Sequence, residues 1–149
     1  MAKTYIYDNN IYSLDMIFAY INIFKPKIKN VSISDLTHML RYKGCGNPTS
    51  KIDYSLIDVI KNPKKYKKEM KHIDEVDMTY PIIIYNNYVI DGVYRLAKAS
   101  LDDKKKIKAY IFTEKKMGKF LIDDDWDVEK VAKLEIYDYI KIFYERFCR

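Results

Sequence analysis

The chain has 149 residues, 48% of them hydrophobic, which predicts one domain, 1–149, with its own buried core. Its 27 basic and 21 acidic residues give a net charge of +6, and this excess favours an anionic partner: a nucleotide, a phosphorylated small molecule or a nucleic acid. Only two cysteines occur, without a CxxC pair or a histidine cluster. The composition therefore argues against a disulfide framework and a structural zinc site, and we assign no metal ligand.

The sequence shows no signal for export or membrane insertion. Its longest apolar stretch, 16–24, is far shorter than the ~20 residues that span a bilayer. The first ten residues lack the apolar core of a signal peptide. We therefore expect an intracellular, cytoplasmic protein without a membrane partner.

The first 76 residues are expected to be mainly helical. Apolar residues recur at helical spacing after Ser13, which can cap a helix, and Pro26 closes that helix. The loop 43–51 holds two of the four glycines and is the best candidate for a ligand-contacting loop. The other expected elements are a strand 31–33, a helix 35–42, a helical turn begun by Asp53 or Ser55, and a helix 63–73 with Pro63 at its first position.

Residues 77–122 predict the core of a small mixed sheet. Strands 81–84 and 88–90 flank Asn86-Asn87, and asparagine tolerates the positive φ of a two-residue hairpin turn. A helix 93–101 and a strand 107–112 follow, and 120–122 is expected as an apolar edge. The pattern of hairpin, helix and strand indicates the α+β class.

Residues 123–149 predict one long amphipathic C-terminal helix, with acidic residues at its start. A broad apolar face must dock on the domain itself or on a partner, which leaves a homo-oligomer as an alternative. This face comprises Val128, Val131, Ile136, Tyr137, Ile140, Phe143, Tyr144 and Phe147.

The strand-to-helix junction at Asp91-Gly92-Val93-Tyr94-Arg95 combines an acid, a permissive backbone and a guanidinium. The first N–H groups of a helix point outward, and the helix dipole adds positive potential there, which suits a phosphate. The alternative is structural: a tight turn in which Arg95 pairs with a carboxylate.

The stretch from Asp77 to Phe112 resembles the ParB/sulfiredoxin superfamily. The similarity lies in the strand 80–84, the segment 89–99 with its Asp-Gly-x-x-Arg motif, and the strand 107–111. It implies a ParB/sulfiredoxin-like core at 77–122, between the mainly helical N-terminal segment, 1–76, and the C-terminal helix, 123–149.

This resemblance implies that Gly92, Val93, Tyr94 and Arg95 bind the phosphates of ATP, ADP or CTP, with Mg²⁺ as a companion. Asp91 matches the acid of the related free-serine kinases, which implies a catalytic role in phosphotransfer or NTP hydrolysis. Two positions depart from the active subfamilies. Val93 replaces the cysteine of sulfiredoxins and the glutamate of partition proteins, and Tyr94 replaces the histidine of the kinases, so whether the chain is an enzyme stays open.

Other residues offer competing interpretations. His72 precedes the hairpin and is a candidate for the nucleotide site, or a structural hydrogen-bonding residue. A non-enzymatic nucleic-acid-binding protein, or an accessory protein of the ParB-like nuclease type, is an alternative function. A scaffold that assembles through its C-terminal helix is another. The lysines of the expected helix 63–73 would contact nucleic acid: Lys64, Lys65, Lys67, Lys68 and Lys71.

Overall fold

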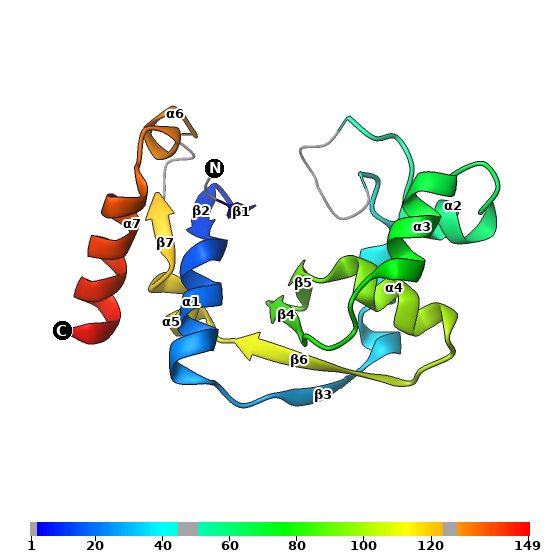
Figure 1. Ribbon diagram of the computed structural model, residues 1–149, viewed down its shortest axis with the longest axis horizontal. Coiled ribbons are helices and arrows are strands. Elements are labelled where there is room, and N and C mark those ends of the chain that lie inside the picture. Colours follow the sequence, from blue (N-terminus) through cyan, green and yellow to red (C-terminus); the bar gives the residue numbers. More distant parts are fainter. Residues whose placement is uncertain (1–2, 45–50, 124–127) are drawn as a thin grey trace. The chain divides into compact units, whose positions relative to one another are not determined.

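The computed structural model describes residues 3–44, 51–123 and 128–149, and these form two compact units (Figure 1). Unit 1 combines Met1–Pro26 with Thr113–Arg149, and unit 2 is Lys27–Phe112. The α+β class is confirmed, whereas the single domain 1–149 stays a prediction. Most of the predicted loop 43–51 lies outside the described residues.

Unit 1 is built on a three-stranded antiparallel sheet in the order β1-β2-β7. The hairpin β1-β2 was not predicted, although its turn residues Asp8 and Asn9 have the positive φ values, 50° and 64°, that a two-residue turn requires. The elements are β1 (Thr4–Tyr7), β2 (Asn10–Ser13), α1 (Leu14–Phe24), α5 (Glu114–Gly118), β7 (Leu121–Asp123), α6 (Val128–Ala132), α7 (Ile136–Phe143) and a π-helical turn, η3 (Tyr144–Cys148).

The helix predicted after Ser13 is confirmed as α1. The buried hydroxyl of Ser13 accepts a hydrogen bond from the Met16 N–H at 3.1 Å, which satisfies one of the free donors of the first turn. The helix ends at Lys25, which adopts a left-handed conformation with φ 47° and donates its N–H to the Ile21 carbonyl. The helix thus begins after Ser13, as predicted, and ends just before the predicted stop at Pro26.

The predicted long C-terminal helix is broken in the structure. Its two α-helical segments, α6 and α7, are separated around Glu135, whose side chain forms a reciprocal capping box with Asp138 at the start of α7. This cap starts a new helix in place of a continuous one.

No helix within the described ranges is long and apolar enough to cross a membrane.

The apolar face predicted for this segment divides between the interior and the surface of unit 1. Phe143 and Phe147 pack 4.8 Å apart, between ring centroids, and Phe147 also contacts the rings of Tyr20 and Phe120. Arg146 donates to the carbonyls of Lys119 (2.9 Å) and Leu121 (2.5 Å), which fastens the chain end to the α5-β7 segment. The exposed portion of the face consists of Ile136, Tyr137, Ile140 and Tyr144.

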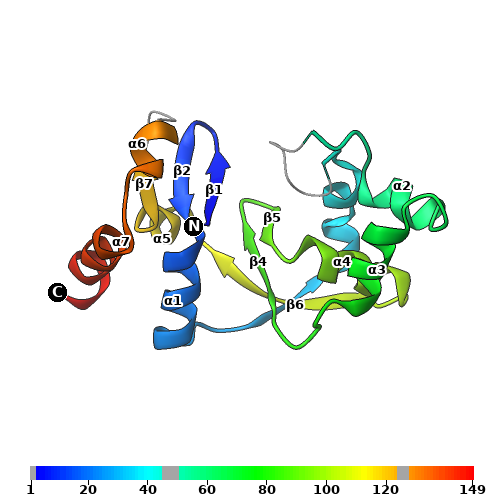
Figure 2. The same ribbon diagram turned by 45° about the horizontal axis from the view of Figure 1, so that its top comes forward.

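Unit 2 is a four-stranded mixed sheet in the order β3-β6-β4-β5 (Figures 1 and 2). Strand β4 pairs with β5 as a hairpin and lies parallel to β6, and α4 makes the connection between β5 and β6. The hairpin, helix and closing strand predicted at 81–112 are thereby confirmed. The strands are β3 (Lys29–Ser32), β4 (Ile82–Tyr85), β5 (Tyr88–Asp91) and β6 (Lys106–Phe112).

Two helices of unit 2 were predicted with wrong form or bounds. No α-helix forms at 35–42; residues 33–41 instead make two 3₁₀ segments on either side of Leu36, which is fully buried. The helix expected from Pro63 begins four residues later, because 63–66 form a turn. The helices are η1 (Ile33–Asp35), η2 (Thr37–Arg41), α2 (Leu56–Lys61), α3 (Lys67–Glu75) and α4 (Val93–Leu101).

One apolar core joins these helices to one face of the sheet. Ile82 and Ile84 of β4 and Ala109 of β6 point into it, and Leu96 of α4 and Ile73 of α3 cover them. All five side chains are less than 5% exposed. This core fixes the first turn of α4 at the edge of the sheet, where the Asp-Gly-x-x-Arg motif lies.

Candidate functional site

The candidate site begins where the β4-β5 hairpin delivers the chain to α4. Asn86 and Asn87 turn the hairpin with φ values of 49° and 62°, as predicted, and Asp91 pairs with Ile83 at the end of β5. Gly92 then takes φ 98° and starts α4 without a side-chain cap. A residue with a Cβ pays roughly 1–2 kcal/mol for such a left-handed conformation, so glycine suits this junction.

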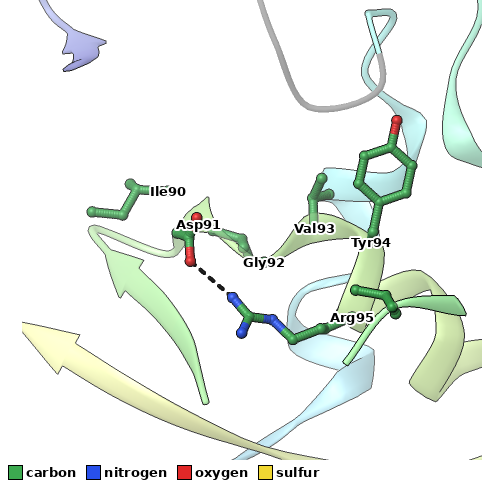
Figure 3. A pocket seen from close by; sticks show the side chains of 8 residues that line it. Ile90, Asp91, Gly92, Val93, Tyr94 and Arg95 are labelled. Atoms are coloured by element: carbon green, nitrogen blue, oxygen red, sulfur yellow. Dashed lines mark hydrogen bonds and ion pairs between the residues drawn. The ribbon is translucent and has the colours of Figure 1, made fainter. Parts of the chain in front are cut away.

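Asp91 and Arg95 form an ion pair across Gly92 (Figure 3). Arg95 Nη2 donates to Asp91 Oδ2 at 2.8 Å, and Nη1 donates to the Tyr80 carbonyl at 3.2 Å. The Arg95 side chain is 12% exposed and that of Asp91 33% exposed. One part of the structural alternative is thus confirmed: Arg95 pairs with a carboxylate, that of Asp91.

The spacing of the motif follows from this contact. A Cβ on Gly92 would lie 2.7 Å from Arg95 Nη2 and 2.9 Å from Nε, so the guanidinium occupies the space that any other residue would fill. It would also lie 2.7 Å from Ile82 Cγ2, in the core. Gly92 therefore permits both the turn and the return of Arg95 to Asp91.

A cavity of about 320 Å³ opens at this junction. Asp91 and Arg95 form its ionic side, and the Val93 and Tyr94 side chains point away from the ion pair in Figure 3. Val93 and Tyr94 are also partly buried against the core of unit 2, which gives both side chains a packing role. The remaining lining residues are Val76, Val89, Ile90 and Gly92.

Arg95, a lining residue of the cavity, has more N–H donors than its bonds to Asp91 and the Tyr80 carbonyl use. A guanidinium carries five N–H donors, and the contacts of the described residues use one on each terminal nitrogen. A phosphate or carboxylate accepts two parallel N–H groups from such a fork. The ion pair with Asp91 therefore orients the Arg95 side chain without using all of its N–H donors.

His72 lies beside the cavity and does not line it. It is exposed on α3, and its ring centroid is 6.0 Å from that of Tyr94. The same helix-to-helix contact includes Lys98, whose ammonium donates to the Asp74 carbonyl at 2.7 Å. The structure therefore places His72 next to one predicted site residue, Tyr94.

Acidic residues near the junction are separate from one another. Hydrogen bonds from Thr79 lower the pKa of Asp77, and the positive charge of Arg95 lowers it further. Within the described ranges, no three His, Cys, Asp or Glu side chains converge as metal ligands. Asp91 is thus the one carboxylate among the cavity-lining residues.

The predicted lysines lie outside the cavity. Lys67, Lys68 and Lys71 are exposed on the side of α3 opposite the buried Ile73. Lys71 is 4.0 Å from Glu75, at the limit of an ion pair. Lys64 and Lys65 are exposed in the preceding turn.

Sequence reasoning missed four contributors to this region: the Tyr80 carbonyl and the lining residues Val76, Val89 and Ile90. The Tyr80 carbonyl binds Arg95, and a backbone group leaves no side-chain signal in the sequence. Val76 contributes to the cavity wall because α3 ends beside α4, a contact between segments that local patterns do not reveal.

The comparisons with known proteins add no relative. No family model, curated protein or solved structure matches this chain.

Proposed function

We propose that unit 2 binds the phosphate group of a nucleotide or of a phosphorylated small molecule in the cavity at Gly92. One observation carries the proposal: the cavity joins an oriented, partly buried guanidinium to a helix N-terminus without a side-chain cap. Both features attract an anion, and together they favour a group with several oxygens. The resemblance of 77–112 to the ParB/sulfiredoxin superfamily supports the same ligand class, and we propose that fold for unit 2.

Asp91 has a double role in this proposal. In the free protein it neutralises Arg95, and an arriving phosphate competes with it for the Nη2 donor. Once displaced, the carboxylate stands beside the phosphate and can accept the proton of an attacking hydroxyl, as a general base does in phosphoryl transfer. A phosphotransferase or NTPase is therefore the enzymatic form of the proposal, with Asp91 as the catalytic residue.

A bound Mg²⁺ would neutralise phosphate charge in such a reaction. The cavity offers one carboxylate, and Mg²⁺ is commonly held by one or two carboxylates together with substrate phosphates. Asp91 is the residue that would hold it. Positioning of the phosphate falls to Arg95 and to the first turn of α4.

The test measures binding of inorganic phosphate, ADP, ATP and CTP, with and without Mg²⁺, by calorimetry and by the shift of the melting midpoint. Asp91→Asn removes a negative charge beside the ligand and releases Arg95, so we expect tighter binding of the phosphate group in the absence of Mg²⁺, and no turnover in its presence. Arg95→Lys keeps the charge but loses the fork, so we expect binding at least 10-fold weaker. Lys61→Gln, at the exposed end of α2 and outside the cavity, is the control and should bind as wild type.

The proposal fails if none of these ligands binds at millimolar concentration. It also fails if folded Asp91→Asn and Arg95→Lys proteins bind as tightly as wild type.

Self-association is a second candidate function, favoured by the exposed face of α7. Ile136, Tyr137, Ile140 and Tyr144 are each at least 60% exposed and recur within three turns. We expect sedimentation to show a dimer that becomes a monomer in Ile140→Lys, whereas Lys130→Gln, outside α7, leaves the mass unchanged. At about 100 μM, a dimer with a dissociation constant in the micromolar range would be detected. A wild-type protein that is monomeric at that concentration removes this candidate.

A further inference from the structure

The positive charge of the chain is concentrated in one of its two units. Unit 2 contains 17 basic and 10 acidic residues, a net charge of +7, whereas unit 1 contains 10 basic and 11 acidic residues, a net charge of −1. Unit 2 therefore carries more net positive charge than the whole chain, although it contains only part of the residues. Such a distribution indicates a polyanionic partner for that unit in particular.

Some of this charge lies on the side of the sheet that faces away from the helices. Along β6, Ile107 and Ala109 point into the core, so the alternate residues Lys106 and Lys108 point to the opposite side, and both are exposed. On the neighbouring strand β3, Ser32 pairs with Lys106 and Asn30 pairs with Lys108. Strand β3 lies beside the first four residues of β6, Lys106 to Ala109, and Figures 1 and 2 show the rest of β6 running on past it.

The lysines of this face have no carboxylate partner among the described residues. No ion pair there involves Lys104, Lys105, Lys106 or Lys108, which lie in and after the turn that ends α4. The nearest acids in sequence, Asp102 and Asp103, belong to the turn before them. By contrast, the lysine-rich helix α3 includes Glu69 and Glu75, and Lys71 approaches Glu75.

We propose that this β3-β6 face, formed by Ser32, Asn30, Lys106, Lys108 and the adjoining Lys104 and Lys105, binds the phosphate backbone of a nucleic-acid strand. Successive residues on one side of a strand lie about 6.8 Å apart, which presents charges in a regular row, as a phosphate backbone does. Asn30 and Ser32 add neutral donors beside the charges. The half-buried Tyr110 continues the row of Lys106 and Lys108 and offers a ring on which a base can stack.

This surface is distinct from the proposed phosphate cavity. None of its residues lines that cavity, and its lysines follow α4 whereas the cavity opens at the start of α4. The two proposals can therefore fail independently.

The test compares two variants that remove the same charge from different places in unit 2. Lys106→Gln with Lys108→Gln alters the β3-β6 face, and Lys67→Gln with Lys68→Gln alters the exposed side of α3. The probes are a 20-nucleotide single strand and the corresponding duplex, each carrying a fluorophore, with anisotropy measured from 50 to 300 mM salt. Circular dichroism confirms that both variants are folded.

We expect the β6 variant to lose about 10- to 25-fold in affinity for the single strand at 0.1 M salt. Two lost phosphate contacts also lower the slope of log K against log salt by about 1.4. The α3 variant should stay within about 3-fold of wild type. The proposal would be overturned if the α3 variant lost as much affinity as the β6 variant or more. It would also be overturned if the affinity did not depend on salt, or if no binding were detected at 50 mM salt.

A further arm uses vesicles that contain phosphatidylserine at the same phosphate concentration. Preference for the oligonucleotide supports a nucleic-acid surface. Equal retention on the vesicles would overturn it in favour of a general attraction to anionic surfaces.

Discussion

Replacing Gly92 with alanine should destabilise the start of α4 and release Arg95. The new Cβ would meet Arg95 Nη2 and Ile82 Cγ2, each at 2.7 Å, far inside a normal van der Waals contact. Ile82 is fully buried in the core and has no free space to retreat into. Arg95 can move only by giving up its bonds to Asp91 and to the Tyr80 carbonyl.

The expected cost has two components. The left-handed φ of 98° costs an alanine about 1–2 kcal/mol. Loss of the charge-assisted bond between Arg95 and Asp91, which is partly exposed, adds on the order of 1 kcal/mol. These two terms sum to roughly 2–3 kcal/mol, and the overlap with Ile82 Cγ2 adds to them, so we expect the variant to be less stable than wild type by at least that amount.

The measurement combines urea unfolding with hydrogen exchange over 88–101, which reports on unit 2 alone. Gly118→Ala is the matched control, because Gly118 lies in α5 and no atom comes within 4 Å of its added Cβ. It should be neutral or gain about 0.5–1 kcal/mol from the higher helix propensity of alanine. If Gly92→Ala exchanges and unfolds within about 0.5 kcal/mol of wild type, the packing argument for the motif is wrong.

Three further changes test other regions of the fold. Ser55→Ala removes the buried hydroxyl that accepts from the Asp58 N–H at 3.2 Å, so urea unfolding should show a loss of about 1 kcal/mol. Hydrogen bonds from Ser55, the backbone N–H first, hold the pKa of Asp58 below its usual 3.8. Its contribution to stability is therefore complete above that pH and is lost as pH falls through the lower folded value, so Asp58→Asn should flatten this acid dependence. Arg146→Ala removes both bonds to the α5-β7 segment, and exchange over 136–148 should rise while exchange over 88–101 stays constant.

The features that the sequence predicted well have strong local signals. The Asn86-Asn87 turn is one, because few residues other than glycine accept positive φ at two successive positions. The bounds of α4 are another, since Gly92 starts it and Asp102 follows its last residue. Helix α1 likewise depended on Ser13 and on an apolar repeat of helical period.

The features that were missed depend on contacts between distant segments. The hairpin β1-β2 is short, and its stability comes from pairing with β7, more than 100 residues later. The helix expected at 35–42 is interrupted at Leu36, whose side chain is fully buried in the core, a contact that the local sequence pattern does not reveal. The break before α7 had a local sign, Glu135 three residues before Asp138, but the continuous apolar repeat concealed it.

The chemistry of the Asp-Gly-x-x-Arg motif could not be predicted from its residue types alone. Its spacing is required by a structural contact: Arg95 reaches Asp91 only over a residue without a Cβ. The same contact places Arg95 in the lining of a cavity, where we propose that an anion competes with Asp91 for the guanidinium. Two interpretations of the Asp91-Arg95 ion pair predict different results for Asp91→Asn: the pair is purely structural, or a bound phosphate displaces Asp91 from Arg95. The first predicts lower stability and no change in phosphate affinity, whereas the second predicts tighter binding at a similar cost in stability.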